Sequence, residues 1–507
     1  MPRDSAPSAH TARTAARAVV VGGGFGGMAA ALRLAARGYR VTLVDRCPRL
    51  GGRAQVFQRD GFRHDAGPTV LTAPFLFEEL FALFGERLSD HVTLTVPDPW
   101  YRFAFPDGAR FDYGPTEART EAEIARLSPG DVAGYRRMAA HSKAIHDKAF
   151  AELADKPFHD PLFMLRQVPD LIRLRSHESV WGMVSRHLED DRLRKAFSIQ
   201  PLLVGGNPYE TTSIYGMISH LERAHGVWFP MGGTGALVDA LTGLMERAGI
   251  EIRTGATVAR IRLEDGRARG VVLEDGGRID ADIVVSNADP AHLYARMLPE
   301  AAPSRLARLR TRHAERSMGL YVLYFGARRQ WPEVAHHTVW FGERHRALLD
   351  EIFNAKTLAE DFSLYVHRPT ATDPSFAPEG CDSFYVLCPV PNLEGAIDWA
   401  AEGPRLRNRI VAALDRTMLP GLAETITAEF AMTPEDFAQD YLSDAGAGFS
   451  ISPFFRQSAW FRYHNRGEGV PGLYLVGAGT HPGAGVPGVV SSARVLDRLV
   501  PAPAEVA

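Results

Sequence analysis

The chain has 507 residues, of which 45% are hydrophobic and 23% charged, and its formal net charge is −3 at pH 7. This composition is typical of a folded globular protein, and the length indicates two or three lobes. The near-neutral charge excludes a strongly basic nucleic-acid-binding protein, and no stretch approaches the ~20 apolar residues of a membrane-spanning helix.

Two features of the sequence bear on the cellular compartment. Residues 1–17 combine arginines with Ala, Ser and Thr, as a transit peptide does, but we predict a short disordered tail there. The three cysteines, Cys47, Cys381 and Cys388, are odd in number and lack metal-binding spacing. The sequence therefore favours a reducing, cytoplasmic setting.

The first predicted element is a complete nucleotide-binding unit. A strand at Ala18–Val21 leads into a glycine turn, a helix and a second strand that ends at Asp45. In this turn Gly22 permits the tight bend, Gly24 lets a pyrophosphate approach the backbone, and Gly27 lets the helix pack on the strand. Asp45 stands 23 positions after Gly22, where such units place the carboxylate that binds a ribose hydroxyl. The unit predicts a bound dinucleotide of Rossmann type.

A second glycine turn directly follows that acid. Gly51, Gly52 and Arg53 come after Arg46, whereas a nicotinamide dehydrogenase would continue with further strand and helix crossovers. This arrangement resembles the large flavoprotein group that includes amine oxidases and carotene desaturases. In that group the Gly-Gly-Arg segment lies along the pyrophosphate and ribityl chain of FAD. The resemblance implies that the dinucleotide is FAD.

Nucleotide-lobe features recur later in the chain, which predicts a discontinuous FAD-binding lobe. Phe229–Leu237 opens a helix, Glu251–Ile261 has the pattern of strands, and Ile283–Val285 is a further apolar strand. Leu473–Thr480 is again a buried strand that ends in a glycine turn. In the resembling family, Val258 contacts the adenine through its backbone.

The intervening regions differ in pattern. Residues 76 to about 225 are largely helical in period, while 300–450 contain apolar, aromatic β-rich runs at Gly319–Phe325, Phe362–His367 and Ser383–Val390. We therefore predict an α/β fold with a mixed-sheet substrate lobe and a helical, membrane-associated region. The predicted boundaries are 1–17 for the tail; 18–75, 226–295 and 455–507 for the FAD-binding lobe; 76–115 and 296–454 for the substrate lobe; and 116–225 for the helical region.

The glycine fingerprint occurs formally a second time, at Gly483–Gly488, but its context differs. Only 19 residues follow Gly488, too few for a helix, a second strand and a distal acid. Val489–Leu499 instead predicts one terminal helix, whose N-terminus from Gly488 points its amides and positive dipole end at the flavin. The sequence therefore predicts no NAD(P)H site.

The segment Leu473–Val489 closely resembles bacterial carotenoid desaturases, phytoene desaturases above all. Ser198–Tyr215, Gly226–Pro230 and Gln457–Arg462 agree as well, so that the resemblance spans nearly the whole chain from Ala18. It implies an FAD-dependent oxidoreductase of CH–CH groups in carotenoid biosynthesis. Such an enzyme converts phytoene by successive dehydrogenations to lycopene or neurosporene, with hydride passing to flavin N5 and electrons to oxygen or a quinone.

Three alternatives stay open. The substrate could be another carotenoid, hydroxylated or shorter, and the reaction could be a flavin-dependent carotene isomerisation. A lipid-surface carotenoid-binding protein with a vestigial flavin is the third.

The resemblance also names the residues expected to bind FAD, mostly glycines and backbone contacts. They are Gly22, Gly24, Phe25, Gly26, Gly27, Asp45, Arg46, Gly51, Gly52, Arg53, Gly67, Pro68, Thr69, Val258, Gly477, Ala478, Gly479, Pro487, Gly488 and Val489. For catalysis the candidate is Arg166, as a group that orients charge near the substrate tunnel. Relatives commonly carry an acid before this Met-Leu-Arg position, where this chain has Phe163, so no carboxylate base is predicted. A solvated or membrane-facing arginine is the competing interpretation.

Membrane contact is expected because phytoene and its products dissolve only in lipid. Phe163–Arg175 mixes apolar residues with three arginines, as does a basic helix in a lipid interface, and Arg305–Arg316 adds a second basic run. An ordinary packing helix fits each pattern equally well. We expect peripheral attachment to the inner face of the cell membrane, with carotenes drawn from the bilayer.

His336 and His337 are a conceivable pair of metal ligands. Adjacent side chains on a strand point to opposite faces, however, and no third ligand is evident from the sequence. We therefore expect no metal.

Overall fold

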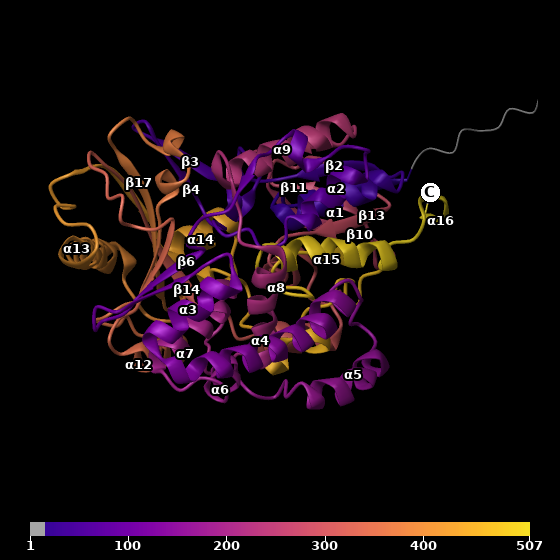
Figure 1. The fold of residues 1–507 in the computed structure, drawn as a ribbon. Coiled ribbons are helices and arrows are strands. Elements are labelled where there is room, and N and C mark those ends of the chain that lie inside the picture. Colours follow the sequence, from indigo (N-terminus) through magenta and orange to yellow (C-terminus); the bar gives the residue numbers. More distant parts are fainter. Residues whose placement is uncertain (1–15, 507) are drawn as a thin grey trace, which may run out of the picture.

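The computed structural model describes residues 16–506, in which two sheet-based lobes lie side by side and a group of helices lies below them in the view of Figure 1. Most of the predicted tail lies outside the described residues. Arg17, its last residue, already belongs to the first strand. The discontinuous α/β architecture that the sequence predicts is confirmed.

The first lobe is built on a five-stranded parallel sheet drawn from three distant parts of the chain. Its central strand is buried on both faces, which explains the unbroken run of valines. In spatial order the strands are β19 (Leu473–Leu475), β13 (Ile283–Ser286), β1 (Arg17–Val21), β2 (Arg40–Val44) and β9 (Glu251–Arg253).

Different layers cover the two faces of this sheet. Ala18 and Val20 face a core built with helices, whereas Val19 and Val21 face a three-stranded antiparallel sheet. The helices are α1 (Phe25–Ala36), α2 (Phe75–Ala82), α9 (Gly233–Arg247) and α15 (Val486–Leu499), and the strands of the small sheet are β10 (Val258–Glu264), β11 (Arg267–Leu273) and β12 (Arg278–Asp280). Because α2 packs here, the substrate lobe begins later than the predicted residue 76.

The second lobe contains a seven-stranded mixed sheet with a strongly aromatic core. The three predicted β-rich runs are strands in it. β6 and β7 join it from the predicted 76–115 segment, and β6 runs parallel to β15. In spatial order the strands are β18 (Ile426–Met432), β14 (Gly319–Ala327), β17 (Asp382–Val390), β16 (Leu364–His367), β15 (His337–Trp340), β6 (Tyr101–Ala104) and β7 (Arg110–Tyr113). Helix α13 (Trp399–Thr417) covers its outer face.

The helical region lies under both lobes, with α8 near the centre and α5 at the periphery (Figure 1). Its helices are α3 (Glu117–Leu127), α4 (Val132–His146), α5 (Pro161–Arg173), α6 (Val180–Ser185), α7 (Asp191–Phe197) and α8 (Met217–His225). The remaining α-helices and strands are short: β3 (Val56–Arg59), β4 (Phe62–Asp65), β5 (Leu94–Thr95), β8 (Phe229–Pro230), α10 (Pro290–His292), α11 (Arg305–His313), α12 (His345–Asp350), α14 (Pro434–Tyr441) and α16 (Pro503–Val506). Within residues 16–506, no helix has the length and apolar character needed to cross a bilayer.

Helix α15 begins two residues before the predicted Gly488. Pro487 occupies its first turn, where a missing N–H costs no hydrogen bond. Gly485 precedes the helix with φ = +89°, a backbone conformation that favours glycine. The second glycine fingerprint is therefore the turn into this helix.

Candidate active site

One cavity between the lobes collects nearly all of the predicted cofactor residues. The turn between β1 and α1, the end of β2 and the turn at 51–53 form one part of its wall, and the N-terminus of α15 forms another. Gly27 and Gly479 are the exceptions. Gly27 packs under the turn against Gly22, and Gly479 packs against Pro290 and Ser450. These two glycines therefore shape the cavity wall from behind.

The glycine turn is closed so tightly that only glycine fits. A Cβ on Gly27 would lie 1.9 Å from the carbonyl oxygen of Gly22, and one on Gly26 would lie 3.2 Å from the Cα of Gly477. No side chain caps the N-terminus of α1, so its first amides are left for another acceptor. An uncapped helix N-terminus in a glycine cradle fits the pyrophosphate of a dinucleotide.

Asp45 is held at the end of β2 by two backbone amides. Gly23 N–H donates to Oδ2 at 2.5 Å and Cys47 N–H donates to Oδ1 at 2.7 Å. Burial raises the pKa of this carboxyl group, and the two amides act in the opposite direction. Each carboxylate oxygen can accept a second hydrogen bond, so Asp45 keeps acceptor capacity for ribose hydroxyls.

Arg53 is a half-buried cation beside the cavity. Its Nη2 donates to Ser443 Oγ and, at 3.5 Å, to the carbonyl oxygen of Ala447, while its guanidinium lies 5.8 Å from the ring centre of Tyr441. Its Nε has no hydrogen-bond partner, and no carboxylate of residues 16–506 forms an ion pair with it. Burial lowers its pKa, and the charge of Asp289 acts in the opposite direction. A half-buried guanidinium without an ion pair fits an anionic ligand. Arg46, in contrast, donates to the carbonyl oxygens of Gln439 and Asp440 on α14.

The other half of the cavity is apolar. Aliphatic side chains from the helical region and from the second sheet face each other across it, as expected for a site that takes a long hydrocarbon. They include Ile199, Leu202, Val204, Met217, Ile218, Leu221, Met318, Leu320, Val339, Leu364 and Leu387.

A few polar groups interrupt this apolar wall, and the sequence-based predictions missed most of them. Thr69 Oγ1 lies 2.5 Å from Tyr365 Oη, which lies 2.7 Å from His337 Nδ1. Glu222 from α8 also lines the cavity and accepts a hydrogen bond from Tyr101. These residues come from separate elements, so no local spacing could have revealed them.

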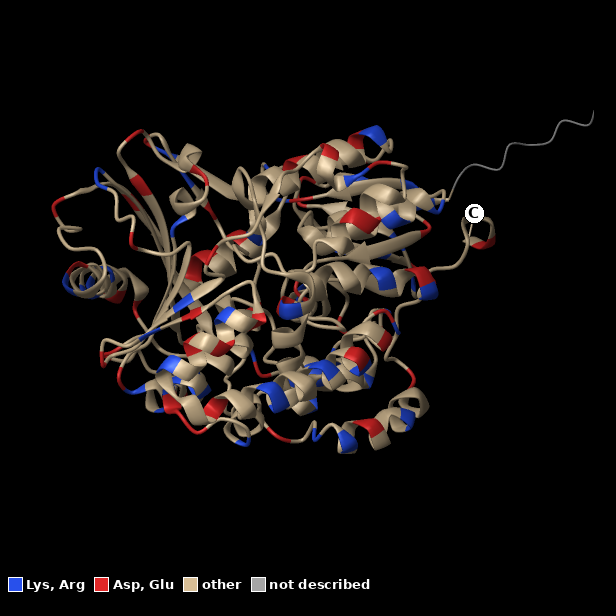
Figure 2. Ribbon diagram, in the orientation of Figure 1, with Lys and Arg blue, Asp and Glu red and all other residues tan. Residues whose placement is uncertain are grey.

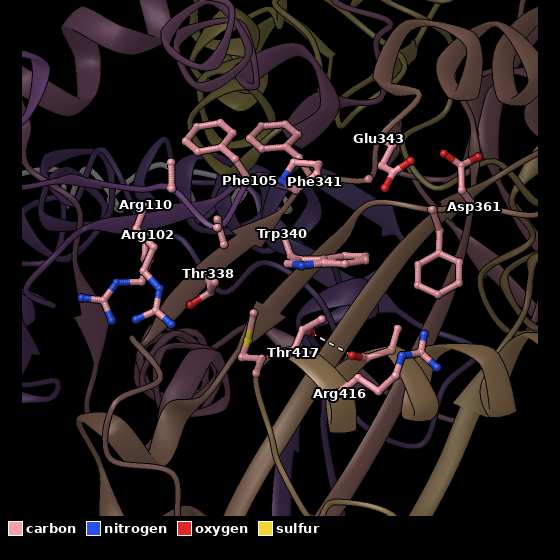
Figure 3. Close-up of a pocket in the computed structure, with 18 of the residues that line it drawn as sticks. Arg102, Phe105, Arg110, Thr338, Trp340, Phe341, Glu343, Asp361, Arg416 and Thr417 are labelled. Carbon is pink, nitrogen blue, oxygen red and sulfur yellow. Dashed lines mark hydrogen bonds between the residues drawn. The ribbon is translucent and has the colours of Figure 1, made fainter. Parts of the chain in front are cut away.

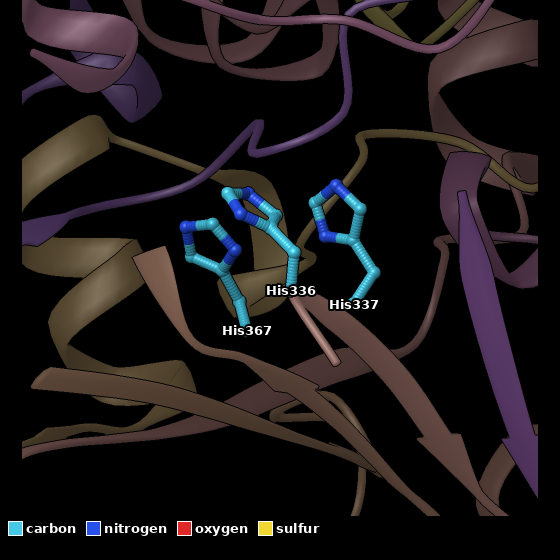
Figure 4. A group of neighbouring side chains, drawn as sticks. All are labelled: His336, His337 and His367. Atoms are coloured by element: carbon cyan, nitrogen blue, oxygen red, sulfur yellow. The ribbon is translucent and has the colours of Figure 1, made fainter. Parts of the chain in front are cut away.

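A third histidine does lie beside the predicted pair, contrary to the expectation from the sequence. Figure 4 shows that His367, on β16, lies beside His336 and His337, and one nitrogen from each lies within 4.8 Å of the others. Thr372 Oγ1 lies 2.6 Å from His336 Nδ1, and burial holds the pKa of His336 and His337 well below the usual value. The three rings pack against one another in an aromatic cluster. The absence of a metal there stays a prediction.

Arg166 is not at the cavity. It lies on the exposed side of α5, away from the residues that line the cofactor and apolar halves. A solvated arginine cannot orient charge at a distant buried site, so the position of Arg166 does not support a catalytic role. Its position agrees with the competing interpretation of a surface-facing residue.

A second cavity, of about 740 Å³, lies beside α13 at the edge of the seven-stranded sheet (Figure 3). Charged and aromatic side chains are mixed in its wall, among them Arg102, Arg416, Asp361 and Trp340. None of the predicted cofactor residues lines it. The cavity between the lobes is therefore the candidate active site.

Comparison with known proteins agrees with this geometry. Residues 25–495 match the family model described as flavin containing amine oxidoreductase. Among solved structures, an oxidoreductase from Methanosarcina mazei superposes with a TM-score of 0.65 at 18% identity, covering 95% of this chain and 100% of that one. Putrescine oxidase superposes with a TM-score of 0.63 at 16% identity over 96% and 99%. At these identities the structural similarity shows the fold alone.

Sequence relatives are much closer. Phytoene desaturase (lycopene-forming) from Pseudescherichia vulneris is 47% identical, covering 96% of this chain and 99% of the relative. The lycopene-forming enzyme from Pantoea ananas is also 47% identical, over 95% and 98%. Phytoene desaturase (neurosporene-forming) from Rhodobacter capsulatus is 44% identical, over 96% and 94%. The chain therefore belongs to the flavin-containing amine oxidoreductases and, within them, to the bacterial phytoene desaturases.

Proposed function

We propose that this chain is an FAD-dependent oxidoreductase that dehydrogenates phytoene in carotenoid biosynthesis. The observation that carries the proposal is the single cavity in which a glycine cradle with Asp45 and Arg53 continues into an apolar wall. FAD is the cofactor of this family, and when bound it supplies the two-electron acceptor for a hydride. The cradle fits its pyrophosphate and ribose.

The protein's own task is to hold and align a molecule without polar groups. Burial in the apolar half stabilises such a substrate by roughly 25 cal/mol per Å², partly offset by its extraction from equally apolar lipid. The wall also aligns one carbon–carbon bond of the substrate with the cofactor and excludes water from it.

The cavity does not decide the number of dehydrogenations. Relatives of similar identity form lycopene or neurosporene, so either product fits this chain. A hydroxylated or shorter carotenoid, or isomerisation, would use the same wall. We propose oxygen or a membrane quinone as the acceptor of electrons, since the turn at 483–488 leads into α15 at the same cavity and forms no second nucleotide unit.

We also propose peripheral membrane attachment through α5. Leu162, Leu165 and Ile172 lie at helical spacing and are 61%, 63% and 66% exposed, an unusual apolar face for a soluble surface. Figure 2 shows basic and acidic segments along the same helix, and Asp170 there pairs with Lys148 and Arg173. The apolar face therefore contributes more to attachment than net charge does.

The second basic run contributes less than its sequence suggests. On and just after α11, Arg310 pairs with Glu468 and Arg316 pairs with Asp444, so neither is free for a lipid headgroup. Leu306 and Leu309 of the same helix are exposed. Arg310 Nη2 also donates to the carbonyl oxygen of Trp460 at 3.5 Å, which places α11 beside the turn Ala459–Phe461 that α5 contacts. The two helices thus border one apolar surface, on the side that we assign to the inner face of the cell membrane.

The test is reconstitution with phytoene in anaerobic liposomes. We expect the flavin absorbance to bleach and coloured carotenes to form without NAD(P)H, and admission of oxygen or a quinone to restore the oxidised spectrum. Absorption spectra of the separated products count the double bonds. A flavin-loaded protein that leaves phytoene unchanged would falsify the proposal, while activity on a different carotene would select the alternative substrate.

A further inference from the structure

The apolar half of the cavity contains one buried carboxyl group. Glu222 lies on α8, is 1% exposed, and belongs to the residues that line the cavity. A carboxyl group in an apolar wall is costly unless it is paired or neutral. Its place is therefore a feature that substrate packing alone does not explain.

The surroundings of Glu222 leave one of its oxygens without a hydrogen-bond donor. Tyr101 Oη donates to Oε1 at 3.0 Å, whereas Oε2 is buried and accepts no hydrogen bond. The amide of Gln200 interacts weakly with the carboxyl group and favours its ionised form. Burial raises the pKa of the Tyr113 hydroxyl group, and the negative charge of Glu222 adds to this increase.

The nearest cation is turned away. Arg223 donates to the carbonyl oxygen of Gly114 and to Thr120 Oγ1, both at 3.1 Å, and its guanidinium lies 4.7 Å from the ring centre of Trp100. Glu222 consequently forms no ion pair with any cation of the described chain. Burial raises the pKa of Glu222 to about 7, so that the group changes charge near neutral pH.

Dehydrogenation releases a proton that needs an acceptor. One C–H bond gives up its hydrogen with the electron pair, which is the hydride that the cofactor accepts. The electron pair of the neighbouring C–H bond becomes the new double bond, and its proton is left behind. In an apolar cavity water cannot take this proton readily, and a positioned carboxylate is the ordinary solution.

We infer that Glu222 Oε2 is the proton acceptor of the dehydrogenation, with Tyr101 as the residue that positions it. This inference rests on the proposed function. The carboxylate becomes a carboxylic acid as the double bond forms, and the acid loses the proton to solvent before the next dehydrogenation. Tyr101 supports the carboxylate form because it donates to Oε1.

The first experiment measures flavin bleaching by phytoene in anaerobic liposomes as a function of pH. For the unchanged protein we expect the rate to rise with pH through about 7. Glu222→Gln keeps the size and the acceptor for Tyr101 but cannot take a proton, so the rate should fall by roughly a hundredfold or more and lose this pH dependence. Glu246→Gln, on the exposed side of α9, is the matched control and should change nothing.

The second experiment does not depend on turnover. Infrared spectra of the flavin-loaded protein without phytoene should show a protonated carboxyl band that titrates near pH 7 and is missing in Glu222→Gln. Tyr101→Phe removes the donor to Oε1, so the band and the rate profile should both move to higher pH. A shift to lower pH, or none, contradicts the role of Tyr101.

The outcomes separate this inference from the proposed function. Bleaching at the full rate in Glu222→Gln overturns the inference while leaving phytoene dehydrogenation intact. No bleaching in the unchanged protein overturns the proposed function instead. If Glu222→Gln fails to load flavin, Glu222→Asp replaces it in the experiment, because aspartate keeps a titratable carboxyl group. A slower bleaching rate that still depends on pH then supports the inference. A rate that does not depend on pH overturns it.

Discussion

The two halves of the central cavity are built in different ways. The cofactor half is centred on backbone, because glycines at the turn leave no room for side chains and present amides to the ligand. The apolar half is a side-chain surface gathered from α8, the segment 199–204 and strands of the second sheet. A short contiguous motif can encode a backbone cradle, whereas an apolar wall requires distant segments to meet. The glycine turn therefore tolerates almost no substitution, while the apolar half tolerates exchanges that keep its volume.

The largest effect is expected in the backbone cradle. In Gly27→Val the new Cβ would lie 1.9 Å from the carbonyl oxygen of Gly22, so the turn cannot close. We expect flavin content to fall to background, measured by absorbance per protein. Gly130→Ala is the control, since its Cβ would meet no atom within 4 Å. Normal flavin content in Gly27→Val would show that the cradle is not needed.

The next effect concerns the outer surface that leads to the apolar half. Leu165→Ser with Ile172→Ser on α5 should weaken binding to liposomes by roughly a hundredfold or more, because each buried side chain contributes about 1.5–3 kcal/mol. Co-sedimentation measures it. Leu83→Ser with Val96→Ser, also exposed but away from α5, should bind normally. Equal binding of both double variants would remove α5 from the membrane contact.

Glu222 is an ionisable group in the apolar half, and its raised pKa makes the free energy of unfolding depend on pH. The folded pKa of about 7 lies above the ordinary 4.5, so the unfolded chain releases this proton first as pH rises. Stability attributable to Glu222 is therefore lost between about pH 4.5 and 7, amounting to about 3 kcal/mol. Relative to the unchanged protein, Glu222→Gln should gain stability at pH 8 and not at pH 4.5, as measured by denaturant unfolding.

A smaller effect is expected at the ribose end of the cofactor half. Asp45→Asn places an amide group opposite one of the two backbone N–H donors, Gly23 or Cys47. One lost buried hydrogen bond costs about 1–3 kcal/mol, so FAD affinity should fall roughly tenfold to a hundredfold. Fluorescence titration of the flavin-free protein measures it. Asp265→Asn, in the exposed turn between β10 and β11, should leave affinity unchanged.

The smallest effect is expected at the histidine cluster beside the apolar half. Hydroxyl groups of Thr372 and Tyr365 hold His336 and His337, so the rings are positioned without an ion. Dialysis against a chelator should leave flavin content and melting temperature unchanged. One equivalent of zinc per chain by elemental analysis would contradict this expectation, and His367 would then be the third ligand.

The cofactor lobe was predictable from the residue pattern alone. The valine-rich strand, the glycine turn and the terminal acid have fixed local spacing, so the residue pattern alone was enough to assign β1, α1 and β2. The family resemblance, likewise, rested on contiguous segments such as 473–489. These segments can be recognised from the sequence because the backbone conformation of each turn requires glycine at fixed positions.

The residues that meet in the apolar half could be identified from the folded chain but not from the sequence. β6 joins β15 across more than two hundred residues of chain, which places Tyr101 beside Glu222, and the fold leaves Arg166 outside the cavity. His367 joined His336 and His337 for the same reason, through the pairing of β15 with β16. Burial and charge depend on neighbours that are distant in sequence. The chain alone could therefore indicate where FAD binds, and the fold was needed to find the group that takes the proton.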